Sequence, residues 1–194
     1  NNIHVNDKKL FDELKIYIRN IAPEKESIAK FYDNTKVPIF DHFGIEKQIK
    51  SLFGKTVHMK TGAYLVVEHT EALHVIDVNS GFKSVSNNQE ENALQTNLEA
   101  AEEIARQLRL RDIGGIIVID FIDMNLSSNR QKLSRFLEKT LKERDKFQSV
   151  ALKVSEFGIV QMTRKRSGKT LQQQLTHVCT SCSGLGIVKS ISTI

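Results

Sequence analysis

Two aspartates, each at the end of a short apolar run, are the residues of this chain best suited to chemistry. The runs at 73–77 and 116–120 are rich in β-branched residues, a pattern typical of buried strands. A carboxylate at the end of such a strand stands on a rigid element at the rim of a sheet, and such oxygen ligands suit hard divalent cations. The pattern therefore predicts that Asp77 and Asp120 meet and hold Mg²⁺ for phosphodiester chemistry.

Turn capping is the alternative for both aspartates, because aspartate is common just after strands. Asn79 comes two residues after Asp77 and would project from the same side, where its amide could bind a phosphate oxygen or orient a water. On residue type alone, a turn role for Asn79 is the simpler interpretation. Asp123 is left out of the metal site, because it could equally cap the following helix or support a ligand from outside.

The elements that must position these residues alternate between strands and helices. The periodicity predicts strands at 56–59, 63–68, 73–78, 116–120, 151–154 and 159–163, helices at 7–22, 24–32, 44–53, 90–110 and 128–147, and an extended segment at 37–40. Short turns make the first three strands an antiparallel meander. The long helix at 90–110 joins the two aspartate strands, which can then be neighbours. We expect a mixed α/β (α+β) fold.

Composition sets only broad limits on function. The 194 residues are 40% hydrophobic, enough for one substantial core with a small appended unit. A net charge of +5 favours a polyanionic partner only modestly. No apolar run reaches the roughly 18 residues needed to cross a bilayer, and no secretory segment opens the chain. Because the chain has only two cysteines, a reducing, cytoplasmic setting is expected.

The two cysteines form half of a potential zinc site. Cys179 and Cys182 have Cys-x-x-Cys spacing, and structural Zn²⁺ needs four ligands. Either His177 and another group complete the site, or a second chain donates the same pair. A thioredoxin-type redox role and two free thiols are the alternatives, and the glycine-rich surroundings disfavour the redox role.

Several long motifs make the chain similar to the bacterial ribonuclease E/G family. They lie at 70–81, 97–101, 104–112, 118–124 and 179–186, and the similarity runs from about residue 38 to residue 188. The resemblance maps the metal-binding aspartates of the family onto Asp77 and Asp120. It implies an Mg²⁺-dependent endoribonuclease that cleaves single-stranded RNA to 5′-phosphate and 3′-hydroxyl ends, in the processing and decay of rRNA, mRNA and tRNA in a bacterial cytoplasm.

The resemblance also implies an organisation into three parts. Residues 1–52 would be a partial RNase H-like subdomain, 53–174 a DNase I-like layered catalytic subdomain, and 175–194 a zinc-link. Two chains would share one Zn²⁺ through this link in a homodimer or higher oligomer. We also expect the chain to be part of a longer protein, without the OB-fold, the 5′-end sensor and the small C-terminal domain of the family.

Contacts with RNA are expected to be mostly electrostatic. The candidates are Lys83, in the polar loop after Asn79, and Arg106, Arg109, Arg111, Arg164, Lys165 and Arg166. Arginines on helices are more commonly solvated or paired, which is their alternative role. Phe82 and Gln148 stand where many family members have a basic residue, which affects phosphate contacts and not metal ligands. His69 and His74 lie beside strands and are expected to pack or face solvent rather than catalyse.

Two other functions compete with the ribonuclease. One is a zinc-bridged assembly and RNA-binding fragment with little activity of its own, favoured by the absence of recognition domains. The other is a DNase-like or lipid phosphodiesterase, which would explain the fold but not the motifs.

Overall fold

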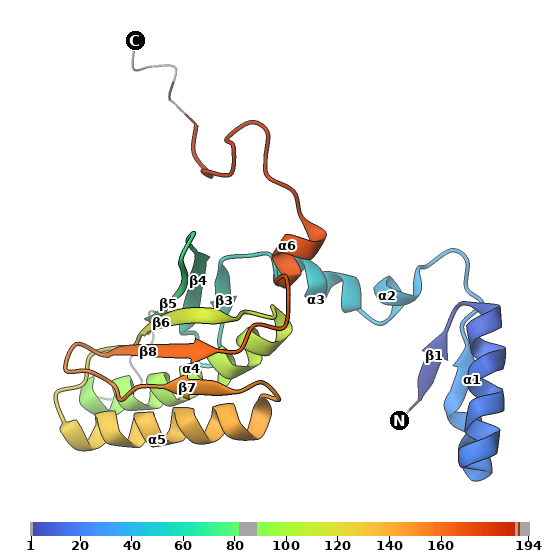
Figure 1. Ribbon diagram of the computed structural model, residues 1–194, viewed down its shortest axis with the longest axis horizontal. Coiled ribbons are helices and arrows are strands. Elements are labelled where there is room, and N and C mark those ends of the chain that lie inside the picture. Colours follow the sequence, from blue (N-terminus) through green and yellow to red (C-terminus); the bar gives the residue numbers. More distant parts are fainter. Residues whose placement is uncertain (1, 82–88, 189, 191–194) are drawn as a thin grey trace. The chain divides into compact units, whose positions relative to one another are not determined.

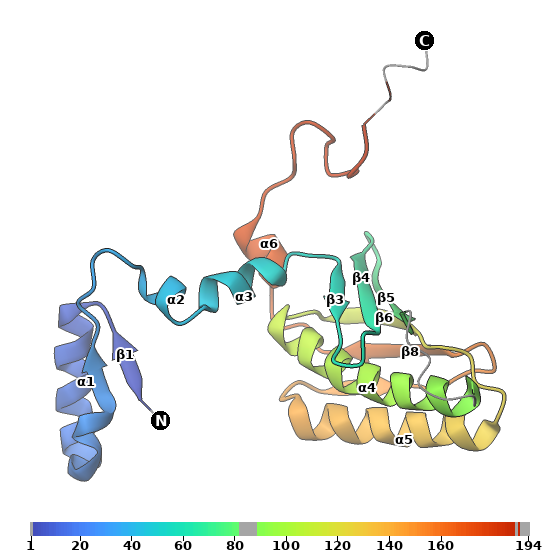
Figure 2. The same cartoon turned by 180° about the vertical axis from the view of Figure 1, so that it is seen from behind.

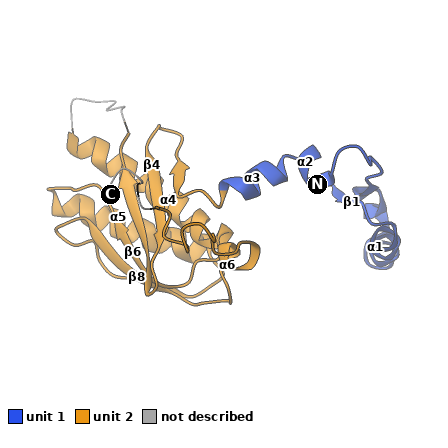
Figure 3. Cartoon of the chain, turned by 90° about the horizontal axis from the view of Figure 1, so that it is seen from above, with its two compact units in different colours: residues 1–51 blue, residues 52–194 orange. Residues whose placement is uncertain are grey.

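The computed structural model describes residues 2–81, 89–188 and 190. The chain divides into two compact units, residues 1–51 and 52–194 (Figure 3). The expected boundaries of an RNase H-like part, a DNase I-like part and a zinc-link stay predictions. None of the helices in the described ranges is long and apolar enough to cross a membrane.

The first unit is built around one amphipathic helix. Its elements are β1 (Ile3–Val5), α1 (Lys8–Ile21), the 3₁₀ helix η1 (Pro23–Ile28), β2 (Ala29–Phe31), α2 (Ile39–His42) and α3 (Ile45–Ser51). β1 and β2 pair in parallel, and α1 connects them. The side chain of Asp7 begins α1 by accepting a hydrogen bond from the Leu10 amide at 2.7 Å.

Two sequence predictions for this unit need correction. The helix expected at 24–32 is the short η1 followed by β2, and the extended segment expected at 37–40 ends at Pro38, because Ile39 begins α2. Proline is well tolerated at the start of a helix, and Pro23 occupies that position in η1. A three-residue strand such as β2 is too short to show a two-residue period, which explains why the sequence did not reveal it.

The second unit contains a six-stranded mixed sheet (Figure 1). The strands are β3 (Thr56–His58), β4 (Tyr64–His69), β5 (Leu73–Asn79), β6 (Gly115–Asp120), β7 (Ser149–Ala151) and β8 (Ile159–Arg164), in the order β3-β4-β5-β6-β8-β7. The expected meander of the first three strands is confirmed, since β3, β4 and β5 pair antiparallel. β5 and β6 pair in parallel, and β8 pairs antiparallel with both β6 and β7.

Two long helices cover one face of this sheet. α4 (Gln89–Leu110) and α5 (Ser127–Arg144) lie side by side on that face in both views (Figures 1 and 2). The core between sheet and helices contains the buried residues Leu65, Ile76, Ile104, Leu108, Ile117, Ile119, Leu133, Leu137 and Val160. Along β8 the buried side chains alternate with exposed or half-buried ones, so the other face of the sheet is largely uncovered. A short helix, α6 (Leu171–Leu175), follows the last strand.

A buried ion pair explains why α5 ends earlier than the sequence suggests. Asp145, which directly follows α5, has an extended backbone, and its carboxylate accepts two hydrogen bonds from the Arg164 guanidinium, at 2.5 and 3.0 Å. Both side chains are shielded from solvent, at 1% and 0% exposure. Arg164 also donates to the Ile113 carbonyl at 2.7 Å, and its guanidinium lies over the Phe147 ring. Arg164 therefore joins the end of α5 to the segment before β6.

Removing the carboxylate of this pair should destabilise the fold strongly. Asp145→Ala leaves the Arg164 charge buried without its main partner, which we expect to cost about 3–5 kcal/mol of unfolding free energy. Urea unfolding followed by circular dichroism measures the loss. Glu138→Ala is the matched control, because Glu138 pairs with Lys142 in water and its removal should cost at most about 0.5 kcal/mol. Equal losses in the two variants would contradict the structural role given to Asp145.

Candidate active site

Asp77 and Asp120 lie directly opposite each other on neighbouring strands. In the parallel pairing of β5 with β6, Asp77 is the register partner of Asp120. Opposite residues of paired strands point to the same face, and here it is the uncovered one, because Ile76 and Ile119 next to them are buried in the core. The spacing between paired strands is about 4.8 Å, so one ion can bind oxygens of both carboxylates. The sequence prediction that these strands are neighbours is confirmed.

The electrostatics of the pair suit a bound cation. Partial burial, followed by the negative charges of Asp77 and Asp123, raises the pKa of Asp120. A divalent cation would relieve this repulsion, and Mg²⁺ takes one or two protein carboxylates and fills its other positions with water or phosphate. The amide of Asn79 donates a hydrogen bond to the Asp77 carboxylate at 2.8 Å, which orients that carboxylate. No group of three or more His, Cys, Asp or Glu side chains suited to a metal occurs among the described residues.

The loop that leaves Asp120 is held by a residue that sequence reasoning missed. Asn97 of α4 is fully buried, accepts a hydrogen bond from the Ile122 amide at 3.0 Å and donates one to the Ile122 carbonyl at 2.8 Å. A fully buried asparagine is uncommon, and this one replaces the hydrogen bonds that a strand neighbour would give to Ile122. The only signal in the sequence was a polar residue on the otherwise apolar face of the helix.

Glu90, in the first turn of α4, anchors the continuation of the same loop. Its carboxylate accepts hydrogen bonds from the backbone amides of Asn125 and Leu126 and from the side chain of Asn129. These bonds, led by that from Asn129, lower the pKa of Glu90. The Glu90 carboxylate therefore fixes the start of α5.

The chain leaving β5 is equally constrained. Gly81 has φ = +68°, and a Cβ there would lie 2.4 Å from the carbonyl oxygen of Gly62 in the turn before β4. Glu99 of α4 holds the same turn by accepting hydrogen bonds from the Lys60 amide and the Thr61 hydroxyl. The segments on both sides of the two aspartates are therefore attached to α4 or to the turn that α4 holds.

The arginines predicted to contact RNA do not gather at this site. Asp120 ends β6 and Asp77 lies two residues before the end of β5. The four arginines at 106, 109, 111 and 166 are instead near the beginning of β6: Arg166 packs against Gly114 and Gly115, and the other three are in or just after the last turns of α4. The aspartates and these arginines are therefore at opposite ends of β6, a strand that rises about 3.3 Å per residue. Arg164 is corrected from a candidate RNA contact to a core residue, because its side chain has no exposed surface. Lys83 lies outside the described residues.

The remaining candidate arginines also make contacts within the protein, and these contacts partly neutralise or bury their charges. Arg106 forms three hydrogen bonds with the carboxylate of Glu103, which raise its pKa, and Arg109 donates to the Arg144 carbonyl. Burial lowers the pKa of Arg111, which donates to Gln107. Arg166 forms no hydrogen bond or ion pair within the described residues, but its side chain lies against Gly114 and Gly115. These arginines therefore serve first to hold the end of α4.

His69 and His74 also lie at the end of the sheet away from the aspartates. Their rings stack with centroids 4.3 Å apart, and His74 is buried. Burial, with smaller contributions from His69 and Arg166, lowers the pKa of His74 to about 4. His74 is therefore neutral near pH 7, and its burial agrees with the expectation that it packs against its neighbours.

The cysteine pair forms a local turn with hydrogen bonds to sulfur. The Gly186 amide donates to the Cys182 Sγ at 3.3 Å, and the Leu185 amide donates to the Cys182 carbonyl. Hydrogen bonds from the backbone of Cys182 and Ser181 lower the pKa of Cys179. Such bonds favour the thiolate, the form that binds metal. His177 does not join the pair in a three-ligand group within the described part of the chain.

Comparisons with known proteins identify the family of the chain. Residues 1–167 match the model of the Ribonuclease E/G family. The chain is 40% identical to Ribonuclease E of Haemophilus influenzae over 188 residues and 36% identical to Ribonuclease G of Escherichia coli K12 over 192 residues. The chain belongs to the ribonuclease E/G family.

The matches cover nearly all of this chain but only part of its relatives. They include 96% of the chain and 20% of the Haemophilus influenzae Ribonuclease E, and 99% of the chain and 39% of the Escherichia coli Ribonuclease G. The family resemblance seen in the motifs is therefore confirmed, and the chain spans about a fifth to two fifths of the length of these relatives.

Replacing Asn97 should disturb the site without removing any of its ligands. Asn97→Ala leaves the amide and carbonyl of Ile122 without their partners, and we expect a loss of about 1–3 kcal/mol in unfolding free energy. Urea unfolding tests this, and the signals of residues 120–125 in amide NMR spectra report the displaced loop. Gln95→Ala, on the exposed side of the same helix, is the control and should cost less than about 0.5 kcal/mol. An unchanged loop in the Asn97 variant would count against this anchoring role.

Proposed function

We propose that this chain carries the catalytic centre of an Mg²⁺-dependent endoribonuclease that cleaves single-stranded RNA. The observation that carries the proposal is the register pairing of Asp77 with Asp120, in a chain that belongs to the ribonuclease E/G family. The names of its relatives, Ribonuclease E and Ribonuclease G, support RNA as the substrate. Processing and decay of RNA in a bacterial cytoplasm belong to the same proposal.

Each residue of the centre has a distinct task in this proposal. Asp77 and Asp120 hold the cation, and Asn79 fixes the orientation of the Asp77 carboxylate through its hydrogen bond. When bound, Mg²⁺ polarises the scissile phosphate and lowers the pKa of a bound water. The anchors Asn97 and Glu90 keep the loop after Asp120 in place, so little energy is spent on reorganisation during the reaction. In-line attack of water on phosphorus leaves a 5′-phosphate and a 3′-hydroxyl.

Zinc-bridged assembly is a second proposed function, and the sulfur contacts of the cysteine turn favour it. Two thiolates leave half of a tetrahedral zinc site unfilled, and a two-fold axis through the metal would fill it with the same pair from a second chain. The hydrogen bonds from backbone amides to the sulfurs of Cys179 and Cys182 favour the thiolates, which are the form that binds metal. The catalytic and the zinc-bridging functions are compatible within one protein.

Neutralising either aspartate should abolish cleavage and leave the fold intact. Asp77→Asn and Asp120→Asn keep the side-chain shape but remove a metal-binding charge, so we expect cleavage of single-stranded RNA in Mg²⁺ to fall at least about 100-fold. A chelator should have the same effect on the parent protein. Glu71→Gln, a carboxylate in the turn at the other end of β5, is the control and should leave the rate unchanged. Cleavage at the parent rate by either aspartate variant would rule out that residue as a ligand.

The cysteine pair is predicted to bind about half a Zn²⁺ per chain, because two chains share one ion. Mass spectrometry under non-denaturing conditions should show a dimer with one zinc, and Cys179→Ser should give a metal-free monomer. Thiolates must lose protons to bind, so the dimer should dissociate as the pH falls or when a chelator is added. A monomer that carries one full zinc would instead indicate His177 or another internal ligand.

A further inference from the structure

One aromatic side chain stands in solvent beside the candidate active site. Phe157 is 80% exposed, more than any other large apolar side chain in the described ranges. It lies in the turn between β7 and β8, which is held by hydrogen bonds from the Ser155 amide to the Ile159 carbonyl, from the Gly158 amide to the Ser155 carbonyl and from the Ile159 amide to the Ser155 hydroxyl. Burying a phenylalanine is favourable, so a ring presented to water by so well bonded a turn suggests a binding role.

The turn of Phe157 is attached to the loop that leaves Asp120. The Phe121 amide donates to the Gly158 carbonyl at 3.2 Å. Gly158 has φ = +74°, and a Cβ there would lie 2.5 Å from the Phe121 carbonyl oxygen and 3.3 Å from the Asp123 carboxylate. Only glycine permits this close approach, so the position of the turn relative to Asp120 is fixed.

Strand register puts this turn in line with the two aspartates. Asp120 is the register partner of Ile159, just as Asp77 is that of Asp120. Asp77, Asp120 and Ile159 therefore form one row across the uncovered face, about 10 Å long at two strand spacings. Phe157 comes two residues before Ile159, in the turn that leads into this row.

A groove on this face brings together the groups that a nucleobase needs. It has a volume of about 420 Å³ and is lined by Leu152, Lys153, Ser155, Phe157, Ile159 and Gln161. The Phe157 ring and the aliphatic side chains can contact the flat face of a base, and the Gln161 amide can both donate to and accept from its edge. Lys153 supplies a positive charge for a neighbouring phosphate and forms no ion pair within the described part of the chain.

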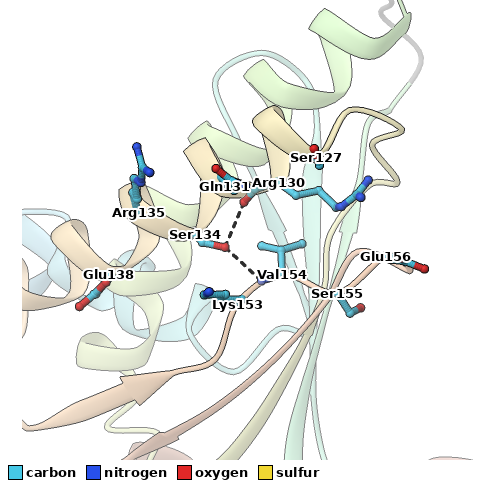
Figure 4. A pocket seen from close by; sticks show the side chains of 10 residues that line it. All are labelled: Ser127, Arg130, Gln131, Ser134, Arg135, Glu138, Lys153, Val154, Ser155 and Glu156. Carbon is cyan, nitrogen blue, oxygen red and sulfur yellow. Dashed lines mark hydrogen bonds between the residues drawn. The ribbon is translucent and has the colours of Figure 1, made fainter.

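The backbone that carries Lys153 is fixed against α5. Figure 4 shows the Ser134 hydroxyl accepting a hydrogen bond from the Val154 amide and donating one to the Arg130 carbonyl, each at 3.0 Å. Lys153 and Ser155 also line the groove of about 540 Å³ drawn there, where Arg130 and Arg135 add positive charge. Glu138 and Glu156 line the same groove, so its charges are mixed, with three basic and two acidic side chains. A lining of charged and polar side chains next to the base-sized groove favours a nucleic acid over an apolar protein segment as its occupant.

We propose that Phe157, with Leu152, Ile159 and Gln161, forms a subsite that stacks one base of the RNA strand next to the phosphate held at Asp77 and Asp120. The proposal rests on the proposed ribonuclease function and extends it. The subsite accepts any base by stacking, and the Gln161 amide adds a preference through the base edge. Phe157 is a positioning residue: it holds the strand, so that the scissile phosphate comes to lie at the two aspartates.

The test is a binding experiment that needs no cleavage. A fluorescent single-stranded RNA of about ten nucleotides is titrated at low salt, in chelator, with the parent protein and with Phe157→Ala. We expect Phe157→Ala to weaken binding about 5- to 100-fold, and Phe157→Trp to restore it to within about 3-fold of the parent. Phe40→Ala removes another exposed phenylalanine, on α2, and should leave binding unchanged.

An RNA with a single abasic position makes the test specific for stacking. When the missing base is the one that occupies the subsite, parent and Phe157→Ala proteins should bind equally, because the contact is already gone. Photocrosslinking of RNA that carries 5-iodouridine at successive positions should attach one position to Phe157. The subsite is refuted if Phe157→Ala binds like the parent, if no abasic position removes the difference, or if the parent shows no RNA binding at low salt.

The outcome can be separated from that of the proposed function. If Asp77→Asn cleaves normally while Phe157→Ala loses stacking, the catalytic assignment fails and the subsite stands as an RNA contact. If Asp77→Asn is inactive and Phe157→Ala binds normally, the catalytic assignment stands and the subsite fails. A Phe157→Ala variant that changes the oligomeric state, measured by native mass spectrometry, instead of RNA binding would identify a protein partner and refute the subsite.

Discussion

The parallel pairing of β5 with β6 is the constraint on which the rest of the site depends. A parallel pair requires a crossover connection, and α4 supplies it while burying its apolar side against the sheet. Register is set by the side chains next to the aspartates: Ile76, Val78 and Ile119 are buried in the core. A slip of one residue would bring these apolar side chains to solvent and a carboxylate into the core. The packing that stabilises the sheet thus also places Asp77 opposite Asp120.

The same helix stabilises the irregular segments around the site. Asn97 and Glu90 fix the loop between β6 and α5, and Glu99 fixes the turn before β4. These contacts join residues more than 20 positions apart in sequence, so they form only when α4 has packed on the sheet. The geometry of the site is therefore a consequence of tertiary packing, and not of local turn propensity.

Much of this fold could be predicted from periodicity, because long elements with one buried face leave a clear pattern. α1, α4 and the strands that carry the aspartates are found close to their expected positions. Two kinds of feature could not be predicted from the sequence. The end of α5 follows from a single long-range contact, the pairing of Asp145 with Arg164, and β1, β2 and α6 are too short to show periodicity. Residue type suggested that arginines near one another in sequence would contact RNA, but it could not show that Arg164 is buried or that α4 ends far from Asp120.

The uncovered face of the sheet explains how two neighbouring carboxylates are tolerated. Burying unpaired like charges would cost far more than a small domain can supply, whereas Asp120 is only partly shielded from solvent and Asp77 receives a hydrogen bond from Asn79. Among the described residues, α4 and α5 cover the opposite face, and the side that carries the charges is open to water, metal and a polyanion. The buried pair of Arg164 and Asp145 joins opposite charges and stabilises the fold. The pair of Asp77 and Asp120 at the open face joins two like charges, so its negative charge is left unneutralised. In the proposed catalytic centre, that unneutralised charge would attract a cation and, through the cation, a phosphate group.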